Sequence, residues 1–320
     1  MAVVTGDYRP GNGHSAPSSA QEDAEPSQVP VELLHLPNLP ESFWAERESL
    51  RVIRQAAHAA SRSADAVLGI VLARVSGMLE PTRIDTGVGS PASLNMFVCP
   101  VGPSGSGKSD AWDIAHRLYP ALYSQDTFAD NLMLGSGEGI AEAFMGSEME
   151  DDGGGKKKAV RKQILHKAFV SADEGGALVA FMTRVGNILG PVLRPAWKGA
   201  PLGPSNATTD RTRRVVDYSL GVAIGFQLTT IGPLLADSVS GTPQRFIYLS
   251  GRDPSVPTEP VRPPAQPDWY YDNMPHGAWT VAQPIRAEIR AHDLAVQRQE
   301  LSVPELDSHA LLTRVKLAGL

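Results

Sequence analysis

A glycine-rich octapeptide at 102–109, GPSGSGKS, constrains this chain more than any other segment. It fits the P-loop pattern of Gly, four residues, then Gly-Lys-Ser or Gly-Lys-Thr. In this pattern the backbone N–H groups surround phosphate, the lysine reaches the β- and γ-phosphates, and the hydroxyl binds Mg²⁺. The motif therefore predicts ATP and Mg²⁺ as cofactors, with Lys108 catalytic and Ser109 a metal ligand. The predicted ATP-binding residues are Gly102, Pro103, Ser104, Gly105, Ser106, Gly107, Lys108 and Ser109.

The segments that flank the octapeptide support this interpretation. The apolar run at 94–99 (LNMFVC) suits a buried strand, and residues 109–118 have helical spacing. A strand, a glycine loop and a helix in this order place bound phosphate at a helix N-terminus. The alternative is a glycine- and serine-rich loop that carries an incidental lysine.

A second apolar run, at 168–172, ends in two carboxylates, Asp173 and Glu174. In a P-loop protein such a strand carries the Walker B motif, so Asp173 is a predicted Mg²⁺ ligand and Glu174 is predicted to orient the attacking water. An apolar run followed by Asp-Glu is common on its own, and its place about 65 residues after Lys108 gives it weight. Glu138, in the GSGEG segment, is the alternative catalytic acid.

Two further polar residues stand at the ends of predicted strands. Gln227 follows the strand at 218–226, next to the Walker B strand, and is predicted to contact the γ-phosphate in the role called sensor 1. Arg245 opens a later strand, and we expect it at one flank, away from its own P-loop, where it reaches a neighbouring subunit's nucleotide. This predicts a homo-oligomer. The alternatives are a solvent-facing glutamine and a plain surface arginine.

The charge distribution limits contact with nucleic acid to local patches. The formal net charge is −6, so the chain as a whole offers no basic surface. Arg211, Arg213 and Arg214, in the polar loop at 203–214, are the predicted contacts with single-stranded DNA. The run at 147–158 changes from acidic to basic and is predicted to be a solvated, mobile loop, with contact to DNA as the alternative.

Composition along the chain suggests four parts. They are a disordered tail at 1–30, an N-terminal helical segment at 31–90, a core at 91–252, and a proline-rich linker with the start of a helical region at 253–320. The final helix stops without a cap, so we expect the chain to be cut inside an element.

No targeting or membrane-spanning segment is evident. The most apolar run, 64–75, is short and contains Asp65 and Arg74, so we expect a cytoplasmic protein with no membrane contact. The single cysteine, Cys99, lies in the strand before the P-loop and is predicted to be a buried thiol. With 42% hydrophobic residues, the chain can bury a sizeable α/β core.

Seven segments in order resemble the RecA-like ATPase module of phage, plasmid and integrative-element replication proteins, the helicase half of primase/helicase-type proteins. They are PESFWAERESLRVIRQAAHA, SADAVLGIVLARV, SLNMFVCPVGPSGSGKSD, GSGEGIAEAFMG, AFVSADEGGAL, YSLGVAIGFQ and TPQRFIYLSG. The likeness covers residues 40–251, roughly two thirds of the chain. It implies a RecA-like P-loop fold with a mostly parallel central sheet, preceded by a helical pair. The family usually continues beyond a helix like DSHALLTRVKLAGL.

By this resemblance Lys108, Ser109, Asp173 and Glu174 take the family's site roles, and so do Gln227 and Arg245. The leading hypothesis is a Mg²⁺-dependent ATPase related to hexameric DNA helicases of mobile elements. One alternative is a nucleotide-dependent binding or regulatory module, or an inactive prophage remnant. A small-molecule kinase is a third, which the N-terminal helices and the lack of an arginine-rich lid sequence disfavour.

Overall fold

The structure is a computed structural model that describes residues 36–121, 127–133, 137–151, 157–182, 188–203, 214–265, 277–298, 300–303, 307 and 309–320. The predicted disordered tail at 1–30 lies outside these residues.

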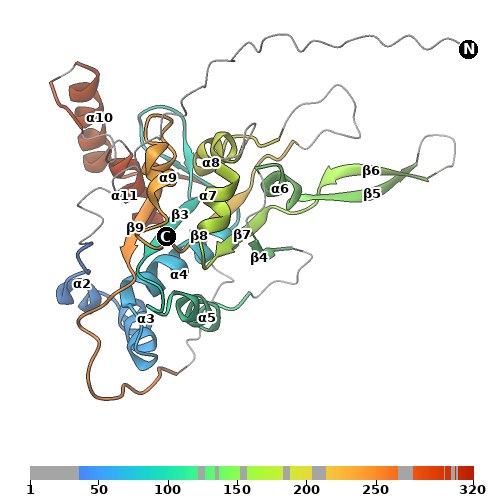
Figure 1. The fold of residues 1–320 in the computed structure, drawn as a ribbon. Helices are drawn as coiled ribbons and strands as arrows, with labels where there is room; N and C mark the ends of the chain where they lie inside the picture. Colours follow the sequence, from blue (N-terminus) through green and yellow to red (C-terminus); the bar gives the residue numbers. More distant parts are fainter. Residues whose placement is uncertain are drawn as a thin grey trace, which may run out of the picture.

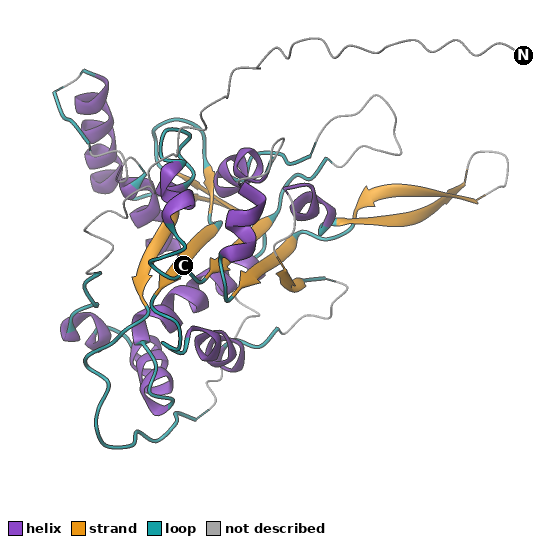
Figure 2. Cartoon of the chain, viewed as in Figure 1, coloured by secondary structure: helices purple, strands orange, loops and turns teal. Residues whose placement is uncertain are grey.

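A five-stranded, all-parallel sheet lies at the centre of the molecule, so the predicted α/β class is confirmed (Figures 1 and 2). The strand order is β4-β7-β8-β3-β9. Its strands are β3 (Met96–Val101), β4 (Ala129–Met133), β7 (Lys167–Ala172), β8 (Ser219–Ile224) and β9 (Phe246–Ser250). Strand β8 pairs with both β3 and β7 and therefore separates the strand before the P-loop from the strand that ends in two acids.

Helices cover both faces of this sheet because its strands are apolar on both sides. Along β3, Met96 and Val98 belong to one hydrophobic cluster and Phe97 and Cys99 to the other, as the two-residue period of a strand requires. The first cluster includes side chains of α3 (Glu48–Ala59), α4 (Ala64–Met78) and α5 (Lys108–Leu118). The second includes side chains of α6 (Gly137–Glu142), α7 (Gly176–Met182), α8 (Leu189–Lys198) and α9 (Gly232–Ala236). Cys99 is fully buried, as expected.

Helix α4, which belongs to the predicted N-terminal helical segment at 31–90, lies directly on the sheet. Every residue of α4 except Leu72 is buried. A Cβ atom at Gly221 of β8 would lie 1.8 Å from the carbonyl oxygen of Ala73, so only glycine permits this approach. Ser63 is the N-cap of this helix, and its Oγ accepts a hydrogen bond of 3.3 Å from the Ala66 N–H. The short helix α2 (Glu41–Ala45) precedes α3.

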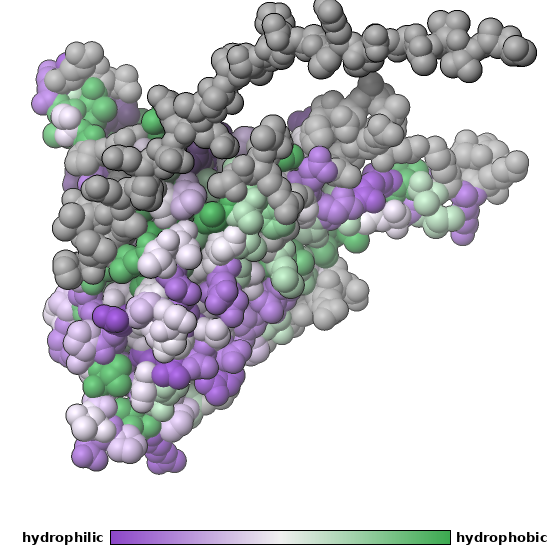
Figure 3. Space-filling view, viewed as in Figure 1, coloured by the Kyte–Doolittle hydropathy of each residue, from purple (hydrophilic) through white to green (hydrophobic). Residues whose placement is uncertain are grey.

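Strands β5 (Met145–Asp151) and β6 (Lys157–Gln163) form an antiparallel hairpin that projects from the body of the molecule (Figure 1). Strongly hydrophilic side chains gather along it (Figure 3). The backbones of 145–151 and 157–163 pair along their whole length, and Lys162 on β6 forms ion pairs with Glu148 and Glu150 on β5. The prediction of a mobile loop at 147–158 is therefore wrong for the described part of this run.

The chain after β9 returns across the molecule. Residues 253–265 pass α3, where the Gln55 side chain donates a hydrogen bond of 2.9 Å to the Arg262 carbonyl. Strand β10 (Gly277–Thr280) joins β1 (Thr82–Asp85) and β2 (Ala92–Ser93) in a second, three-stranded sheet. Helices α10 (Gln283–Gln297) and α11 (Ala310–Gly319) follow. Within the described ranges, no helix is both long and apolar enough to cross a membrane.

Candidate functional site

The predicted site residues from three strands meet at one edge of the central sheet. Because β3, β7 and β8 are parallel, the P-loop, the Asp173-Glu174 pair and Gln227 all follow the carboxyl ends of their strands. Ligands of open α/β sheets bind at this edge.

The P-loop connects β3 to α5 through two glycines in the left-handed region. Gly105 has a φ of 75° and Gly107 a φ of 76°, values that side chains other than glycine rarely adopt. Gly107 is the N-cap of α5, and Lys108 is the first residue of that helix. The free N–H groups of the first turn therefore face the loop, which suits an anion.

Lys108 folds back onto its own loop. Its Nζ donates hydrogen bonds to the carbonyl oxygens of Gly102 at 3.1 Å and Pro103 at 2.9 Å. Partial burial lowers the pKa of Lys108, and the nearby carboxylates of Glu174 and Asp173 oppose this shift. The ammonium group thus stays within the loop, bonded to its own backbone carbonyls.

Ser109 and Asp173 are in direct contact, although β8 lies between their strands. The Ser109 Oγ donates a hydrogen bond of 2.9 Å to Asp173 Oδ2. Asp173 and Glu174 are both exposed at the carboxyl end of β7. A hydroxyl and a carboxylate at this separation fit Mg²⁺, which takes one or two protein oxygens and completes its shell with water and phosphate. The residues present therefore fit the predicted metal. In the described part of the chain, no group of three or more His, Cys, Asp or Glu side chains could hold a metal ion.

The backbone after β8 joins the P-loop to the acidic strand. The Gly102 N–H donates to the Phe226 carbonyl at 3.0 Å, and the Gly225 N–H donates to the Ala172 carbonyl at 2.8 Å. Gln227, which is half-buried, comes directly after this connection. The structure thus brings Gln227 to the same edge as the P-loop and the acidic pair.

Two other predicted residues lie elsewhere. Glu138 is exposed in the first turn of α6, on the face of the sheet opposite α5. Arg245 precedes β9, so it lies at the amino edge of the sheet, opposite the P-loop. There its guanidinium carbon is 5.9 Å from the centroid of the Trp197 ring, and its Nη1 donates to the Gly241 carbonyl. An action of Arg245 on a neighbouring subunit stays a prediction.

Only part of the predicted DNA-binding loop can be placed. Arg211 and Arg213 lie outside the described residues. Arg214 is exposed and precedes Val215, whose backbone pairs with Leu202 before β8 begins.

Sequence reasoning missed a pocket of about 620 Å³ beside the P-loop. Its walls are residues 103–106 of the loop, 61–63 between α3 and α4, and 251–254 and 256 after β9. Arg62 and Arg252 bring positive charge to it. No local pattern marks these arginines, because they reach the P-loop only through the packing of α4 and β9 on the sheet.

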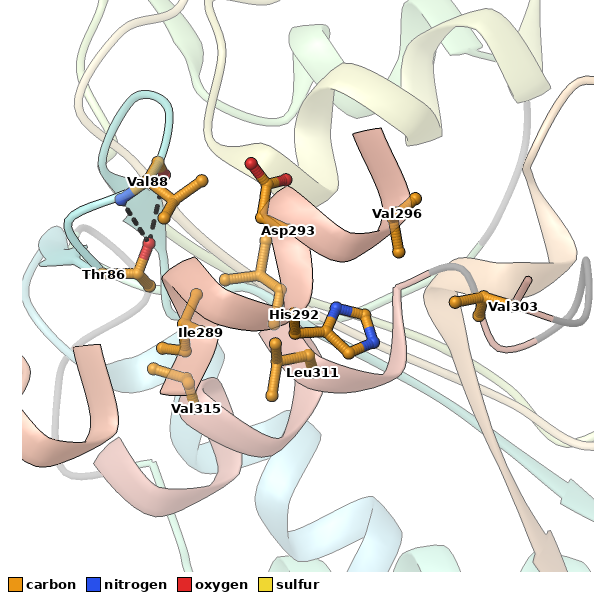
Figure 4. Close-up of a pocket in the computed structure, with 10 residues that line it drawn as sticks. Thr86, Val88, Ile289, His292, Asp293, Val296, Val303, Leu311 and Val315 are labelled. Atoms are coloured by element: carbon orange, nitrogen blue, oxygen red, sulfur yellow. Dashed lines mark hydrogen bonds between the residues drawn. The ribbon is translucent and has the colours of Figure 1, made fainter. Parts of the chain in front are cut away.

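A second cavity, of about 380 Å³, lies between α10, α11 and the loop after β1 (Figure 4). Its lining is mainly Val, Leu and Ile side chains, with Thr86, His292 and Asp293 as the polar members. Thr86 is committed to a local turn, where its Oγ1 accepts from the Val88 N–H at 3.4 Å. None of these residues lines the P-loop pocket.

In comparisons with known proteins, no protein-family model and no curated protein matches the chain.

Proposed function

We propose that this chain is a Mg²⁺-dependent P-loop ATPase of RecA-like fold, related to the hexameric DNA helicases of mobile elements. The observation that carries the proposal is the hydrogen bond from Ser109 to Asp173 at the carboxyl edge of the sheet. Two motifs far apart in the chain meet where the chemistry of a nucleotide-bound metal needs a hydroxyl and a carboxylate. The all-parallel sheet is compatible with a RecA-like fold.

Each residue has a role that follows from its position. The P-loop N–H groups and Lys108 bind the β- and γ-phosphates, which requires Lys108 to exchange the Gly102 and Pro103 carbonyls for phosphate oxygens. Ser109 and Asp173 hold Mg²⁺, which neutralises charge on the phosphates when bound. Glu174 orients water and accepts its proton, and Gln227 senses the γ-phosphate.

The proposal includes assembly and DNA contact as separate parts. Hexameric helicases act as rings, so we propose a homo-oligomer. Single-stranded DNA would bind through the loop that contains Arg211, Arg213 and Arg214. Among these, Arg214 is exposed, which supports its availability to a partner.

The test is steady-state ATP turnover, with and without Mg²⁺ and with and without single-stranded DNA. Mg²⁺-dependent turnover that DNA stimulates supports the motor. Slow turnover that DNA leaves unchanged favours a nucleotide-dependent regulatory module, and phosphate transfer to an added acceptor favours a kinase. Absence of both nucleotide binding and turnover would overturn the proposal.

A further inference from the structure

Arg62, from the connection between α3 and α4, lies directly against the P-loop. An ideal Cβ atom on Gly107 would be 2.1 Å from Arg62 Nε, so the side chain occupies the space that a larger residue at Gly107 would need. The Nε donates a hydrogen bond of 2.5 Å to Asp110, in the first turn of α5, and Nη2 contacts the same carboxylate. Arg62 thus bridges the helices that precede the core and the helix that follows the P-loop.

The backbone that carries Arg62 is held firmly in place. The neighbouring Ser63 Oγ donates a hydrogen bond of 2.7 Å to the Ser250 carbonyl at the end of β9. Asp253 accepts hydrogen bonds from the Ala64 N–H at 3.2 Å, and its other oxygen accepts from the Ser255 N–H at 2.9 Å. His58 lies 3.0 Å from the same carboxylate. This network ties the α3–α4 connection to the chain after β9 and forms one wall of the P-loop pocket.

The guanidinium group of Arg62 is only partly used by the protein. Nη1 donates to the Ser61 carbonyl at 3.1 Å, and Nε and Nη2 contact Asp110, which leaves two of the five N–H donors of a guanidinium. The side chain is 32% exposed and lines the pocket of about 620 Å³ together with Ser104 and Gly105 of the loop. A planar guanidinium can bind a carboxylate and a phosphate at once.

We propose that Arg62 is a phosphate-binding residue of the same subunit, which contacts the phosphate chain of a nucleotide held by the P-loop while it stays paired with Asp110. This inference rests on the proposed function. It assigns to the helical segment before the core a direct part in nucleotide binding, which the P-loop motif alone does not contain.

The pairing with Asp110 suggests a second role that must be separated from the first. A carboxylate in the first turn of α5 repels an incoming phosphate, and Arg62 neutralises it. If neutralisation were its whole contribution, removal of the Asp110 charge would make Arg62 dispensable. If Arg62 contacts phosphate, its loss weakens binding whether or not Asp110 is charged.

The experiment is a double-mutant cycle on equilibrium binding of a fluorescent ATP analogue with Mg²⁺. The variants are Arg62→Ala, Asp110→Asn and the pair together, with Arg62→Lys to retain charge. Arg51→Ala on the exposed side of α3 is the matched control. We expect Arg62→Ala to weaken binding about 10- to 100-fold, as for a lost hydrogen bond to a charged group. The double variant should still bind the analogue at least about 10-fold more weakly than the wild type. Arg62→Lys should recover part of the affinity, and circular dichroism should confirm that each variant folds.

Two results would overturn the inference: wild-type affinity in Arg62→Ala, or full recovery of affinity in the double variant. Lys108→Ala, measured in parallel, separates this inference from the proposed function. If Lys108→Ala loses ATP binding and Arg62→Ala keeps wild-type affinity, only the role of Arg62 is contradicted. Unchanged binding in Lys108→Ala contradicts the P-loop site itself, and the proposed role of Arg62 with it.

Discussion

The Ser109 hydroxyl donates a hydrogen bond of 2.9 Å to the Asp173 carboxylate across a separation of 64 residues. The contact depends on the parallel order of β3, β8 and β7, because only then do the P-loop and the acidic pair leave the sheet at the same edge. Ser109 and Asp173 would be the residues that hold Mg²⁺, which would supply positive charge to the phosphates of a bound nucleotide.

The first prediction concerns the P-loop lysine. Lys108→Ala removes the charge that we assign to the β- and γ-phosphates and should lower ATP turnover about 100-fold or more. The fold should persist, because the lysine bonds only to carbonyls of its own loop, at Gly102 and Pro103. Turnover and a thermal melt measure the two effects. Lys157→Ala, on the projecting hairpin, is the control, and equal turnover in both variants would contradict the assignment.

The second prediction separates the two acids of β7. Glu174→Gln should bind ATP and Mg²⁺ normally and hydrolyse about 100-fold more slowly, because the water loses its base. Asp173→Asn should also raise the Mg²⁺ concentration needed for half-maximal turnover. A Mg²⁺ titration of both variants checks this difference. Normal hydrolysis in both would move the catalytic acid elsewhere, and Glu138→Gln would then be tested.

Sequence patterns indicated that several of the predicted site residues follow strands, but they did not indicate what surrounds them, for a physical reason. The spacing of the P-loop requires a strand, a turn of glycines and a helix, and the apolar run before Asp173 suits another strand. Both are local patterns, and the parallel pairing of β3, β8 and β7 brings their carboxyl ends to one edge. Arg62 and Arg252, in contrast, reach the P-loop through tertiary packing, and no pattern in their own segments indicates this.

Buried charged side chains could not be predicted from local sequence patterns either, because their partners lie in distant segments. Lys316 lies on α11, and its side chain is fully buried. Its Nζ donates to the Asn95 carbonyl at 2.9 Å and the Trp197 carbonyl at 2.5 Å. Burial lowers the pKa of Lys316 well below its ordinary value. The acceptors belong to distant segments, so the apolar period of the helix could not reveal them. The projecting hairpin was likewise missed, because the start of the run at 147–158 pairs with a strand, β6, that continues beyond the run to Gln163.

The third prediction concerns Arg74, which is buried in α4. Its Nη2 donates to Asp130 at 2.9 Å, its Nη1 pairs with the other oxygen at 2.5 Å, and its Nε donates to the Tyr119 carbonyl at 2.6 Å. Although burial opposes it, hydrogen bonds from His116 and Arg74 hold the pKa of Asp130 below its usual range. Arg74→Met should therefore lower the free energy of unfolding by about 3 kcal/mol, since it leaves a partly buried carboxylate without its partner.

The matched control is Arg51→Met, which breaks an exposed ion pair with Glu48 and should cost less than about 1 kcal/mol. Urea unfolding of both variants compares the two pairs. Equal losses of unfolding free energy in Arg74→Met and Arg51→Met would contradict a larger contribution from the buried pair. Because the pKa of Asp130 is low in the folded state, stability also depends on pH. The contribution of Asp130 to the free energy of unfolding is complete above about pH 4 and is lost as the pH falls further.

The fourth prediction is a pH dependence at the start of α11. Burial, together with the charges of Arg245, Lys198 and Lys316, lowers the pKa of His309 to about 4. The unfolded chain takes up this proton near pH 6.5, so the folded state binds fewer protons between these values. The contribution of His309 to the free energy of unfolding should therefore be complete above about pH 6.5 and fall as the pH drops toward 4. Thermal melts of the protein and of His309→Gln across this range isolate the effect, with His292→Gln as control. A parallel pH dependence in all three would contradict it.

The last prediction concerns Arg245, for which two accounts predict opposite results. As an arginine that acts on a neighbouring subunit's nucleotide, its loss should cost about 10³-fold or more in turnover. Its contacts favour a structural role, because it packs over Trp197 and bonds to Gly241 at the amino edge of the sheet. We therefore expect Arg245→Ala to lose about 1–2 kcal/mol of stability, from a cation–π contact and a hydrogen bond, with turnover per folded molecule unchanged.

The measurement is turnover below the melting transition, for Arg245→Ala alone and co-assembled with Lys108→Ala. If Arg245 is structural, the mixture gives only the activity of the Arg245→Ala subunits, because Arg245 contributes nothing to the nucleotide site of a neighbouring subunit. In the other account Arg245→Ala alone is inactive, and the mixture recovers turnover where an intact P-loop meets an intact Arg245. Such recovery would mean that the amino edge of one sheet faces the carboxyl edge of the next. That arrangement would reverse the structural assignment and require a head-to-tail assembly, since the two edges are different surfaces of the same subunit.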